Sequence, residues 1–179
     1  MSLFRNRLVQ GGDAAALLDY YERNKAFFKP WEPSRPLAFN QLGFWVEQVA
    51  LREIQHIEKS AAYWVSENTH DGQIIAHCSL TNTVRGVFQA AYMGYAIDKR
   101  YQAKGLMKAL CLDVISYAFN EFKLNRVMAN HMPINTRSEK LLRSLGFVKE
   151  GYAERYLKIN GRWEDHVLNA LVNPNSDSE

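Results

Sequence analysis

The spacing of hydrophobic residues alternates between the two-residue period of a strand and the longer period of a helix. A short strand is predicted at residues 5–9, and Asp13 can cap a helix over residues 14–24. Prolines then bound a loop at residues 29–36. Over residues 39–59 hydrophobic side chains recur near helical spacing, which predicts a second helix.

Three strands are predicted in the middle of the chain, at residues 60–68, 73–84 and 88–98. The segments between them contain an Asp-Gly pair and an Arg-Gly pair, which suit tight turns between antiparallel neighbours. The middle of the chain is therefore expected to form an antiparallel meander.

After this meander the helical period returns. Hydrophobic residues at four-residue steps from Leu106 to Ala118 predict a helix. A strand is predicted at residues 126–132. The segment of residues 136–147 is predicted to form a helix that Gly146 stops.

The last two predicted strands, at residues 151–159 and 162–172, flank an Asn-Gly pair, the strongest hairpin signal in the chain. Together these elements describe one α+β domain over residues 1–172. We expect a mixed, mostly antiparallel sheet of about seven strands, flanked by about four helices. Residues 173–179 are expected to form a flexible tail.

Composition and charge narrow the class of protein. The chain has 179 residues, of which 47% are hydrophobic and 23% charged, and this suits one well-buried domain. Its net charge of +3 is spread along the chain, so direct nucleic-acid binding is not expected. No segment has the pattern of a secretory signal or a membrane-spanning helix, and we expect a soluble, cytoplasmic protein.

The residues that most often bind metals or act as nucleophiles are scattered. Cys78 and Cys111 each lie among apolar neighbours in a predicted strand and a predicted helix, which favours small buried hydrophobes over nucleophiles. The five histidines lack the spacing of metal ligands. No metal site is therefore expected.

The segment Q-A-K-G-L-M, residues 102–107, lies between a predicted strand and a predicted helix. Such a turn leaves backbone N–H groups unpaired at the positive end of the helix dipole, so it suits an anion. Gly105 permits close approach of the backbone to a phosphate, and Lys104 adds attraction. The spacings of the P-loop and of the dinucleotide-binding motif are absent. Taken alone, an ordinary loop with a capping glycine fits equally well.

Several motifs together resemble the Gcn5-related N-acetyltransferase (GNAT) superfamily. They are Q-x-x-G-x-x before a helix, "NHMPINTRSEKLLRSLGFVKEGY" and "NGRWEDHVLNAL". The segments "KPWEP", "YMGYAID", "YQAKGLM", "RVMANHMP" and "DHVLNAL" are most similar to RimJ-type ribosomal-protein-alanine N-acetyltransferases, and the resemblance spans nearly the whole chain. It implies acetyl-CoA as cosubstrate and a protein N-terminus, in a ribosomal protein, as acceptor. Met107 departs from the small residue of many superfamily members, but RimJ-type proteins share this departure.

The resemblance also assigns residues to the cosubstrate. Tyr95, Ala96 and Ile97 should lie beside the pantetheine arm, in a gap where their strand splays from the next, and Asn130 and Asn135 should help to fix that arm. For Asn135 a helix cap is an equally good interpretation and is compatible with this role. The backbone amides expected to hold the pyrophosphate belong to Gln102, Ala103, Lys104, Gly105, Leu106 and Met107.

The proton donor for the leaving thiolate is less clear. Many superfamily members use a tyrosine on the last helix, but the aligned residue here is Leu142. One turn earlier, Ser138 resembles a serine of related ribosomal-protein acetyltransferases and could donate to the thiolate directly or through water. A solvated serine in the first turn of a helix is the competing interpretation.

Three acids are candidates for a base or an acceptor contact: Glu32, Glu164 and Asp165. The strand period places Asp165 on the same face as nearby hydrophobic residues, which favours a structural role. We favour Glu32 as catalytic base or acceptor contact, with Trp31 beside it, because their loop should lie at the peptide entrance and the carboxylate could attract an ammonium group. An exposed loop acid is the alternative.

Two other functions stay open from the sequence. One is acetylation of a small amine, such as a polyamine or an aminoglycoside. The other is a non-catalytic protein of the same fold that holds CoA or a ribosomal partner, an option that Leu142 keeps open. The sequence gives no indication of the oligomeric state.

Overall fold

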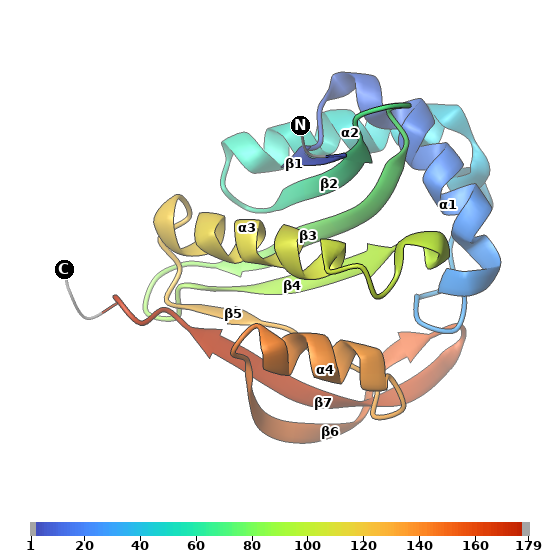
Figure 1. The fold of residues 1–179 in the computed structure, drawn as a ribbon. Coiled ribbons are helices and arrows are strands. Elements are labelled where there is room, and N and C mark those ends of the chain that lie inside the picture. Colours follow the sequence, from blue (N-terminus) through green and yellow to red (C-terminus); the bar gives the residue numbers. More distant parts are fainter. Residues whose placement is uncertain (1–2, 177–179) are drawn as a thin grey trace.

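A seven-stranded sheet forms the centre of the structure, a computed structural model that describes residues 3–176 (Figure 1). Its strand order is β1-β2-β3-β4-β5-β7-β6. The strands are β1 (Phe4–Leu8), β2 (Ala62–Asn68), β3 (Ile74–Val84), β4 (Ala90–Ile97), β5 (Arg126–Met128), β6 (Val148–Ile159) and β7 (Arg162–Val172). The helices are α1 (Ala14–Phe28), α2 (Leu42–Ile57), α3 (Leu106–Asn120) and α4 (Thr136–Ser144).

The parallel pairing of β4 with β5 interrupts an otherwise antiparallel sheet. These two strands pair only from Ala90 opposite Arg126 to Tyr92 opposite Met128. Since β4 continues to Ile97, its second half runs on without β5 beside it. The sheet is therefore open at this point, on the side of β4 that leads to residues 102–107.

Helices cover both faces of the sheet. Trp64 of β2 belongs to one hydrophobic core, whereas the next residue, Val65, belongs to a second core with α1 and α2. Because successive residues of a strand point to opposite faces, the two cores lie on opposite sides of the sheet. Leu110 of α3 and Leu142 of α4 share the first core, and Figure 1 shows these two helices on the same face.

The first two helices differ from their predicted bounds. α1 ends at Phe28 instead of residue 24, because Phe28 packs against Tyr20 and the polar Asn24 is buried inside the fold. α2 starts at Leu42 instead of residue 39, because residues 37–40 form a short 3-10 turn. The pattern of hydrophobic residues did not distinguish that turn from an extra helical turn.

The predicted strand at residues 126–132 is shorter than expected and ends at Met128. The side-chain oxygen of Asn130 accepts a hydrogen bond from the backbone N–H of Asn169, which interrupts the ladder before an isolated bridge between His131 and Val167. These differences move the ends of elements and leave their order intact. The α+β fold is confirmed.

The two ends of the chain fall partly outside the described residues. Asn173 begins the predicted flexible tail, and its backbone N–H donates to Asn125 over 2.7 Å. Residues 177–179 of that tail lie outside the described part of the structure, as do residues 1–2.

Candidate active site

A cleft of about 480 Å³ extends from the N-terminal ends of α3 and α4 to the loop that follows α1. It contains almost all of the residues predicted for the cosubstrate and the acceptor, although they come from distant parts of the chain. Those that line it are Trp31, Glu32, Tyr95, Ala96, Ile97, Gln102, Ala103, Lys104, Gly105, Leu106, Met107, Asn135 and Ser138. One continuous space thus joins the predicted phosphate turn to the predicted acceptor loop.

The turn before α3 forms the end of the cleft that is predicted to bind phosphate. Ala103 and Gly105 both have left-handed backbone conformations, with φ of 59° and 77°. Glycine adopts this conformation without strain, whereas alanine does not, and such strain is common at functional sites. The N-cap of α3 is Gly105, which has no side chain to cap the first turn, and this turn lines the cleft. A Cβ at Gly105 would meet no atom within 4 Å, so space for an anion is open beside it.

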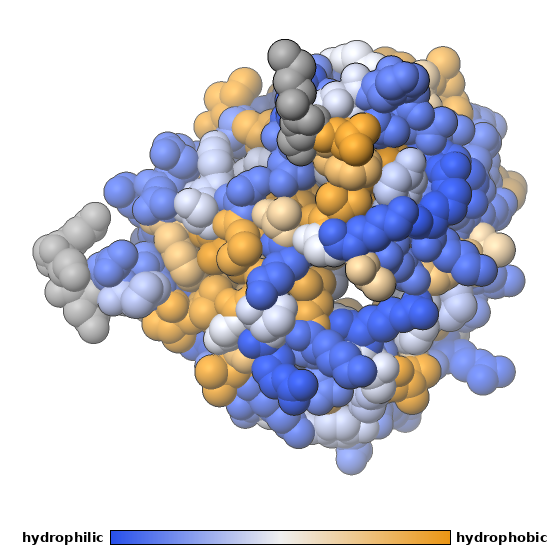
Figure 2. Space-filling model, in the orientation of Figure 1, coloured by the Kyte–Doolittle hydropathy of each residue, from blue (hydrophilic) through white to orange (hydrophobic). Residues whose placement is uncertain are grey.

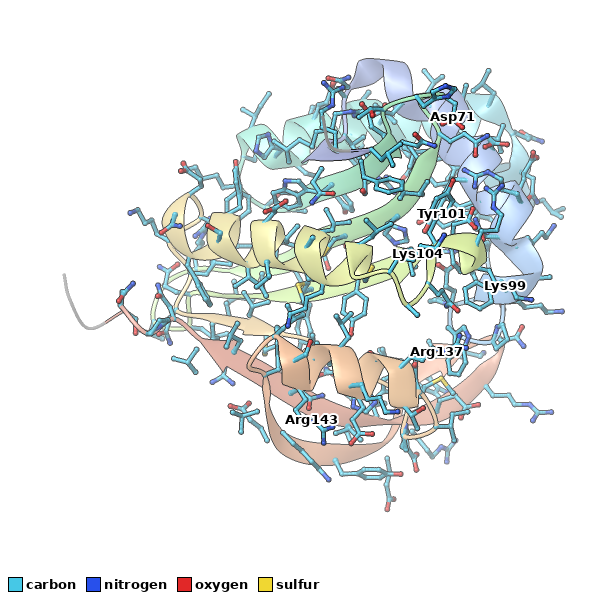
Figure 3. The ribbon with its side chains drawn as sticks, viewed as in Figure 1. Asp71, Lys99, Tyr101, Lys104, Arg137 and Arg143 are labelled. Carbon is cyan, nitrogen blue, oxygen red and sulfur yellow. The ribbon has the colours of Figure 1, made fainter. Side chains whose placement is uncertain are left out.

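Basic side chains surround the same end. Lys104, Lys108, Arg137 and Lys140 line the cleft. Figure 3 shows Lys104 and Arg137 on opposite sides of the gap between α3 and α4, and the side chains near this mouth are hydrophilic in Figure 2. Arg137 donates to the side-chain oxygen of Gln102 over 2.8 Å, which links α4 to the turn. This end of the cleft suits phosphate groups.

Asp98, which directly follows β4, anchors the turn and was not singled out from the sequence. It is 1% exposed, pairs with Arg23 and Arg100, and accepts a hydrogen bond from Asn24 over 3.1 Å. Burial alone would raise the pKa of its carboxyl, but hydrogen bonds from Arg100 and Asn24 lower it to about 2. An aspartate between a strand and a turn is a known turn-forming signal and could have indicated this role.

Two hydroxyl groups meet in the middle of the cleft. The phenol oxygen of Tyr95 lies 2.6 Å from Ser138 Oγ. Asn135 caps α4 by accepting a hydrogen bond from the backbone N–H of Ser138 over 3.1 Å, so the capping interpretation holds while Asn135 also lines the cleft. Burial raises the pKa of Tyr95 well above its ordinary value, so the phenol stays protonated at neutral pH. Ser138 is 9% exposed, which does not fit the solvated serine of the competing interpretation.

Leu142, which the family resemblance aligned with a tyrosine of many superfamily members, faces the core. Its side chain is 1% exposed and packs in the core between α4 and the sheet. The neighbouring residue on the helix, Leu141, lines the cleft instead. The helix therefore contributes an apolar wall at this level, and the hydroxyl groups come from Ser138 and Tyr95.

The structure does not bring Asn130 to the cleft. Its amide donates to the phenol oxygen of Tyr156 over 3.3 Å, and its side-chain oxygen is held by the backbone of Asn169. Asn130 alternates along its segment with Ala129, which faces the core under α3 and α4. Its side chain therefore projects from the opposite face, a consequence of strand register that its position after a strand did not reveal.

Glu32 lines the cleft with Trp31 beside it, at the end predicted to receive the acceptor. Its carboxylate pairs with Arg35 at 3.1 Å, yet burial raises the pKa of this carboxyl above its ordinary value despite that guanidinium. Its backbone oxygen accepts a hydrogen bond from Asn160 over 2.9 Å, which ties the loop to the β6–β7 hairpin. Glu32 is thus partly desolvated and fixed by its contacts with Arg35 and Asn160, unlike a freely exposed loop acid.

The other two acids lie elsewhere. Asp165 accepts hydrogen bonds from the phenol of Tyr152 over 2.6 Å and from the backbone of Arg155 over 2.8 Å. Neither Asp165 nor Glu164 lines the cleft. These contacts hold the β6–β7 hairpin together, in agreement with the structural role expected for Asp165.

Three further expectations concern the cysteines, a metal site and a membrane-spanning helix within residues 3–176. Cys78 and Cys111 are buried in the core as free thiols. No group of three or more His, Cys, Asp or Glu side chains in this range could hold a metal ion. None of the helices in this range is long and apolar enough to cross a membrane.

Comparisons with known proteins find similar sequences and similar folds. The chain is 43% identical over 168 residues to the [Ribosomal protein uS5]-alanine N-acetyltransferase of Escherichia coli, covering 94% of this chain and 87% of that protein. A ribosomal-protein-S5-alanine acetyltransferase of Vibrio fischeri superposes with a TM-score of 0.95 at 36% identity, over 98% of this chain and 96% of that one. RimJ of Mycobacterium smegmatis, in complex with a CoA disulfide, superposes with a TM-score of 0.85 at 25% identity, over 94% and 81% of the two chains. A model of the acetyltransferase (GNAT) domain family matches residues 6–148, and the chain belongs to this family of acetyltransferases.

Proposed function

We propose that this protein is a cytoplasmic enzyme that transfers the acetyl group of acetyl-CoA to the α-amino group of a protein N-terminus, an alanine of a ribosomal protein. One observation carries the proposal. A single cleft joins an amide-lined, basic turn to a pair of hydroxyl groups and then to the partly desolvated Glu32. The names of the relatives in E. coli and V. fischeri support the choice of acceptor.

The residues at the phosphate end fit acetyl-CoA. The backbone amides of the turn and the cations Lys104 and Arg137 would hold the pyrophosphate. The part of β4 that lacks β5 beside it, from Tyr95 to Ile97, would pair with the pantetheine amides as an added strand does. Bound in this way, acetyl-CoA supplies an activated thioester in the middle of the cleft.

The middle of the cleft provides the chemistry that this chain contributes. Ser138 donates a hydrogen bond to the departing thiolate, which needs little more help because a thiol has a reference pKa of about 8.5. Glu32 attracts the acceptor ammonium and accepts hydrogen bonds from it. Neither residue has to act as a strong acid or a strong base.

This modest machinery favours an α-amine over a lysine side chain. The α-amino group has a reference pKa of about 7.7–8.0 and the lysine ammonium about 10.4. Near neutral pH the neutral, nucleophilic form of the α-amine is therefore populated some hundreds of times more than that of a lysine side chain. We assign the acceptor as the α-amine of a small first residue.

The proposal is tested with two peptides of otherwise identical sequence. One begins with alanine, and the other has a blocked N-terminus and a single internal lysine. We expect release of free CoA thiol and labelling of the α-amine, located by fragmentation mass spectrometry. Preferential labelling of the lysine, or turnover of spermidine alone, would reject the assignment to an N-terminus. Binding of CoA without any turnover would identify a non-catalytic protein.

A further inference from the structure

Tyr95 is a residue of β4 whose side chain also lines the cleft. Its ring packs against the core under α3 and α4. Its phenol oxygen reaches Ser138 on α4 at 2.6 Å, within the same cleft. The bond therefore spans from the part of β4 that has separated from β5 to the first turn of α4.

A bond between two hydroxyl groups contains one proton, so one group donates and the other accepts. The phenol is the more acidic of the two, and an acidic hydroxyl is the better donor. Burial keeps the phenol protonated, because it raises the pKa of Tyr95 above its ordinary value. Geometry alone allows either oxygen to donate, and from the greater acidity of a phenol we assign Tyr95 as the donor and Ser138 Oγ as the acceptor.

This assignment leaves the hydroxyl proton of Ser138 free for another acceptor. The backbone N–H of Ser138 is already used, because it donates to Asn135. With Tyr95 fixed on one side of Oγ and the helix on the other, the remaining direction for the serine proton is into the cleft. Donors in such a chain polarise one another, so a bond from Tyr95 strengthens the next bond from Ser138.

We propose that Tyr95 is a positioning residue, whose hydroxyl orients Ser138 toward the departing sulfur of CoA and strengthens the hydrogen bond that Ser138 donates there. The inference rests on the function proposed above for Ser138. In the reaction, the amine lone pair forms the new C–N bond and the C–S bond breaks with its electron pair on sulfur. The proton lost by the amine leaves to water, and Ser138 and Tyr95 keep their own protons.

This role of Tyr95 can be tested by measuring the thiol pKa of enzyme-bound CoA, without any amine acceptor. A hydrogen bond donated to a thiolate lowers the pKa of its thiol. The thiol pKa can be measured with CoA and excess enzyme, by following the ultraviolet absorbance of the thiolate as pH is raised. In the wild type we expect a lower pKa than for free CoA. Tyr95→Phe, which removes only the hydroxyl, should raise it toward the value of free CoA, and Ser138→Ala should raise it at least as far.

The double variant decides whether Tyr95 acts through Ser138. If Tyr95 acts through Ser138 alone, the CoA thiol bound to the double variant should have the same pKa as in Ser138→Ala. The control is Tyr92→Phe, on the same strand, which removes a hydroxyl that lies 3.3 Å from Tyr156 and outside the cleft. It should keep the wild-type value.

Three results would overturn the inference: a wild-type thiol pKa in Tyr95→Phe, additive shifts in the double variant, or an equal shift in Tyr92→Phe. CoA affinity measured by calorimetry should change less than twofold in Tyr95→Phe, since the hydroxyl is not proposed to hold the cofactor itself. Labelling of lysine by the wild-type enzyme would reject the proposed acceptor and leave these titrations unaffected. The two failures are therefore distinguishable.

Discussion

Asn24 of α1 donates a hydrogen bond to the carboxylate of Asp98 over 3.1 Å, and this bond joins the first helix to the residue that follows β4. The side-chain oxygen of Asn24 also accepts from the backbone N–H of Lys99 over 3.2 Å. Arg23, one residue earlier on α1, pairs with the same carboxylate. The segment that leads into the turn at residues 102–107 is thus held by α1, and Asn24 and Asp98 are 74 residues apart in the chain.

The low pKa of Asp98 predicts a loss of stability in acid. Its folded pKa is about 2, below the ordinary value of 3.8, so its contribution is fully present above the unfolded pKa and is lost as pH falls toward 2. This contribution is about 2 kcal/mol in the free energy of unfolding. Urea unfolding of wild type and Asp98→Asn, measured at pH 7 and between pH 4 and 2, should show a loss that is larger in the wild type by about this amount.

The matched control for Asp98 is Asp71→Asn. Asp71 is an exposed loop acid that accepts one backbone hydrogen bond, from Gln73 over 3.0 Å, and Figure 3 shows it far from the cleft mouth. An asparagine oxygen can accept the same bond. The Asp71→Asn variant should retain the acid dependence of the wild type, and an unchanged dependence in Asp98→Asn would contradict the assignment.

Replacing Gly105 with valine should weaken CoA binding and also cost stability. The left-handed φ of 77° is strained for a β-branched residue, by about 1–2 kcal/mol. The new side chain would also occupy the open space where we place the pyrophosphate. Gly72→Val is the control, because Gly72 has φ of 71° and a Cβ there would also meet no atom within 4 Å, but it lies outside the cleft.

Calorimetry and thermal unfolding separate the two effects at Gly105. Both variants should lose similar stability, and only Gly105→Val should lose CoA affinity, by at least about tenfold, since a clash with a phosphate removes several charge-assisted hydrogen bonds. Equal CoA affinity in the two variants would place the pyrophosphate elsewhere.

Ser138→Ala should lower kcat by about 10- to 100-fold, since a hydrogen bond to a charged group contributes about 1.5–3 kcal/mol. The KM for acetyl-CoA should change little, because the interaction is made mainly with the departing thiolate. Ser144→Ala is the control on the same helix, where the serine is exposed and donates to the carbonyl of Leu141. Steady-state kinetics with equal kcat in wild type and Ser138→Ala would return Ser138 to a purely structural role.

Local patterns were enough to predict the order of elements, whereas most of the cleft residues were assigned by the family resemblance. The turn from Gln102 to Met107 has its own signature, because a glycine between a strand and a helix indicates a left-handed backbone position. The Asn-Gly pair fixed the last hairpin, whose strands pair as expected. These features depend on residues that are neighbours in the chain.

Long-range register decided what the patterns could not. Leu142 faces the core and Asn130 faces away from the cleft because of where α4 and β5 pack on the sheet. The bond between Tyr95 and Ser138 joins residues 43 positions apart, so no local spacing indicates it. Strand pairing fixes the faces of a sheet, and a single sequence does not contain that pairing directly.

Glu32 should be a residue that serves activity at the expense of stability. Burial raises its pKa, which means that its ionised form is disfavoured in the folded protein and that its contribution to stability is lost as pH rises through the folded pKa. Glu32→Gln removes the charge and keeps the shape. Its thermal stability at pH 7 should therefore equal or exceed that of the wild type, although Arg35 loses its partner, because that guanidinium is already 41% exposed.

The same variant should bind the peptide acceptor less well. A neutral amide attracts the N-terminal ammonium more weakly, so the KM for the alanine-initiated peptide should rise by about tenfold while the affinity for CoA stays unchanged. Glu58→Gln, an exposed acid at the end of α2, serves as control and should match the wild type in both properties. Steady-state kinetics and thermal unfolding are measured on the same preparations. An unchanged peptide KM in Glu32→Gln would contradict the acceptor contact, and lower stability at pH 7 would show instead that this carboxylate holds the loop in place.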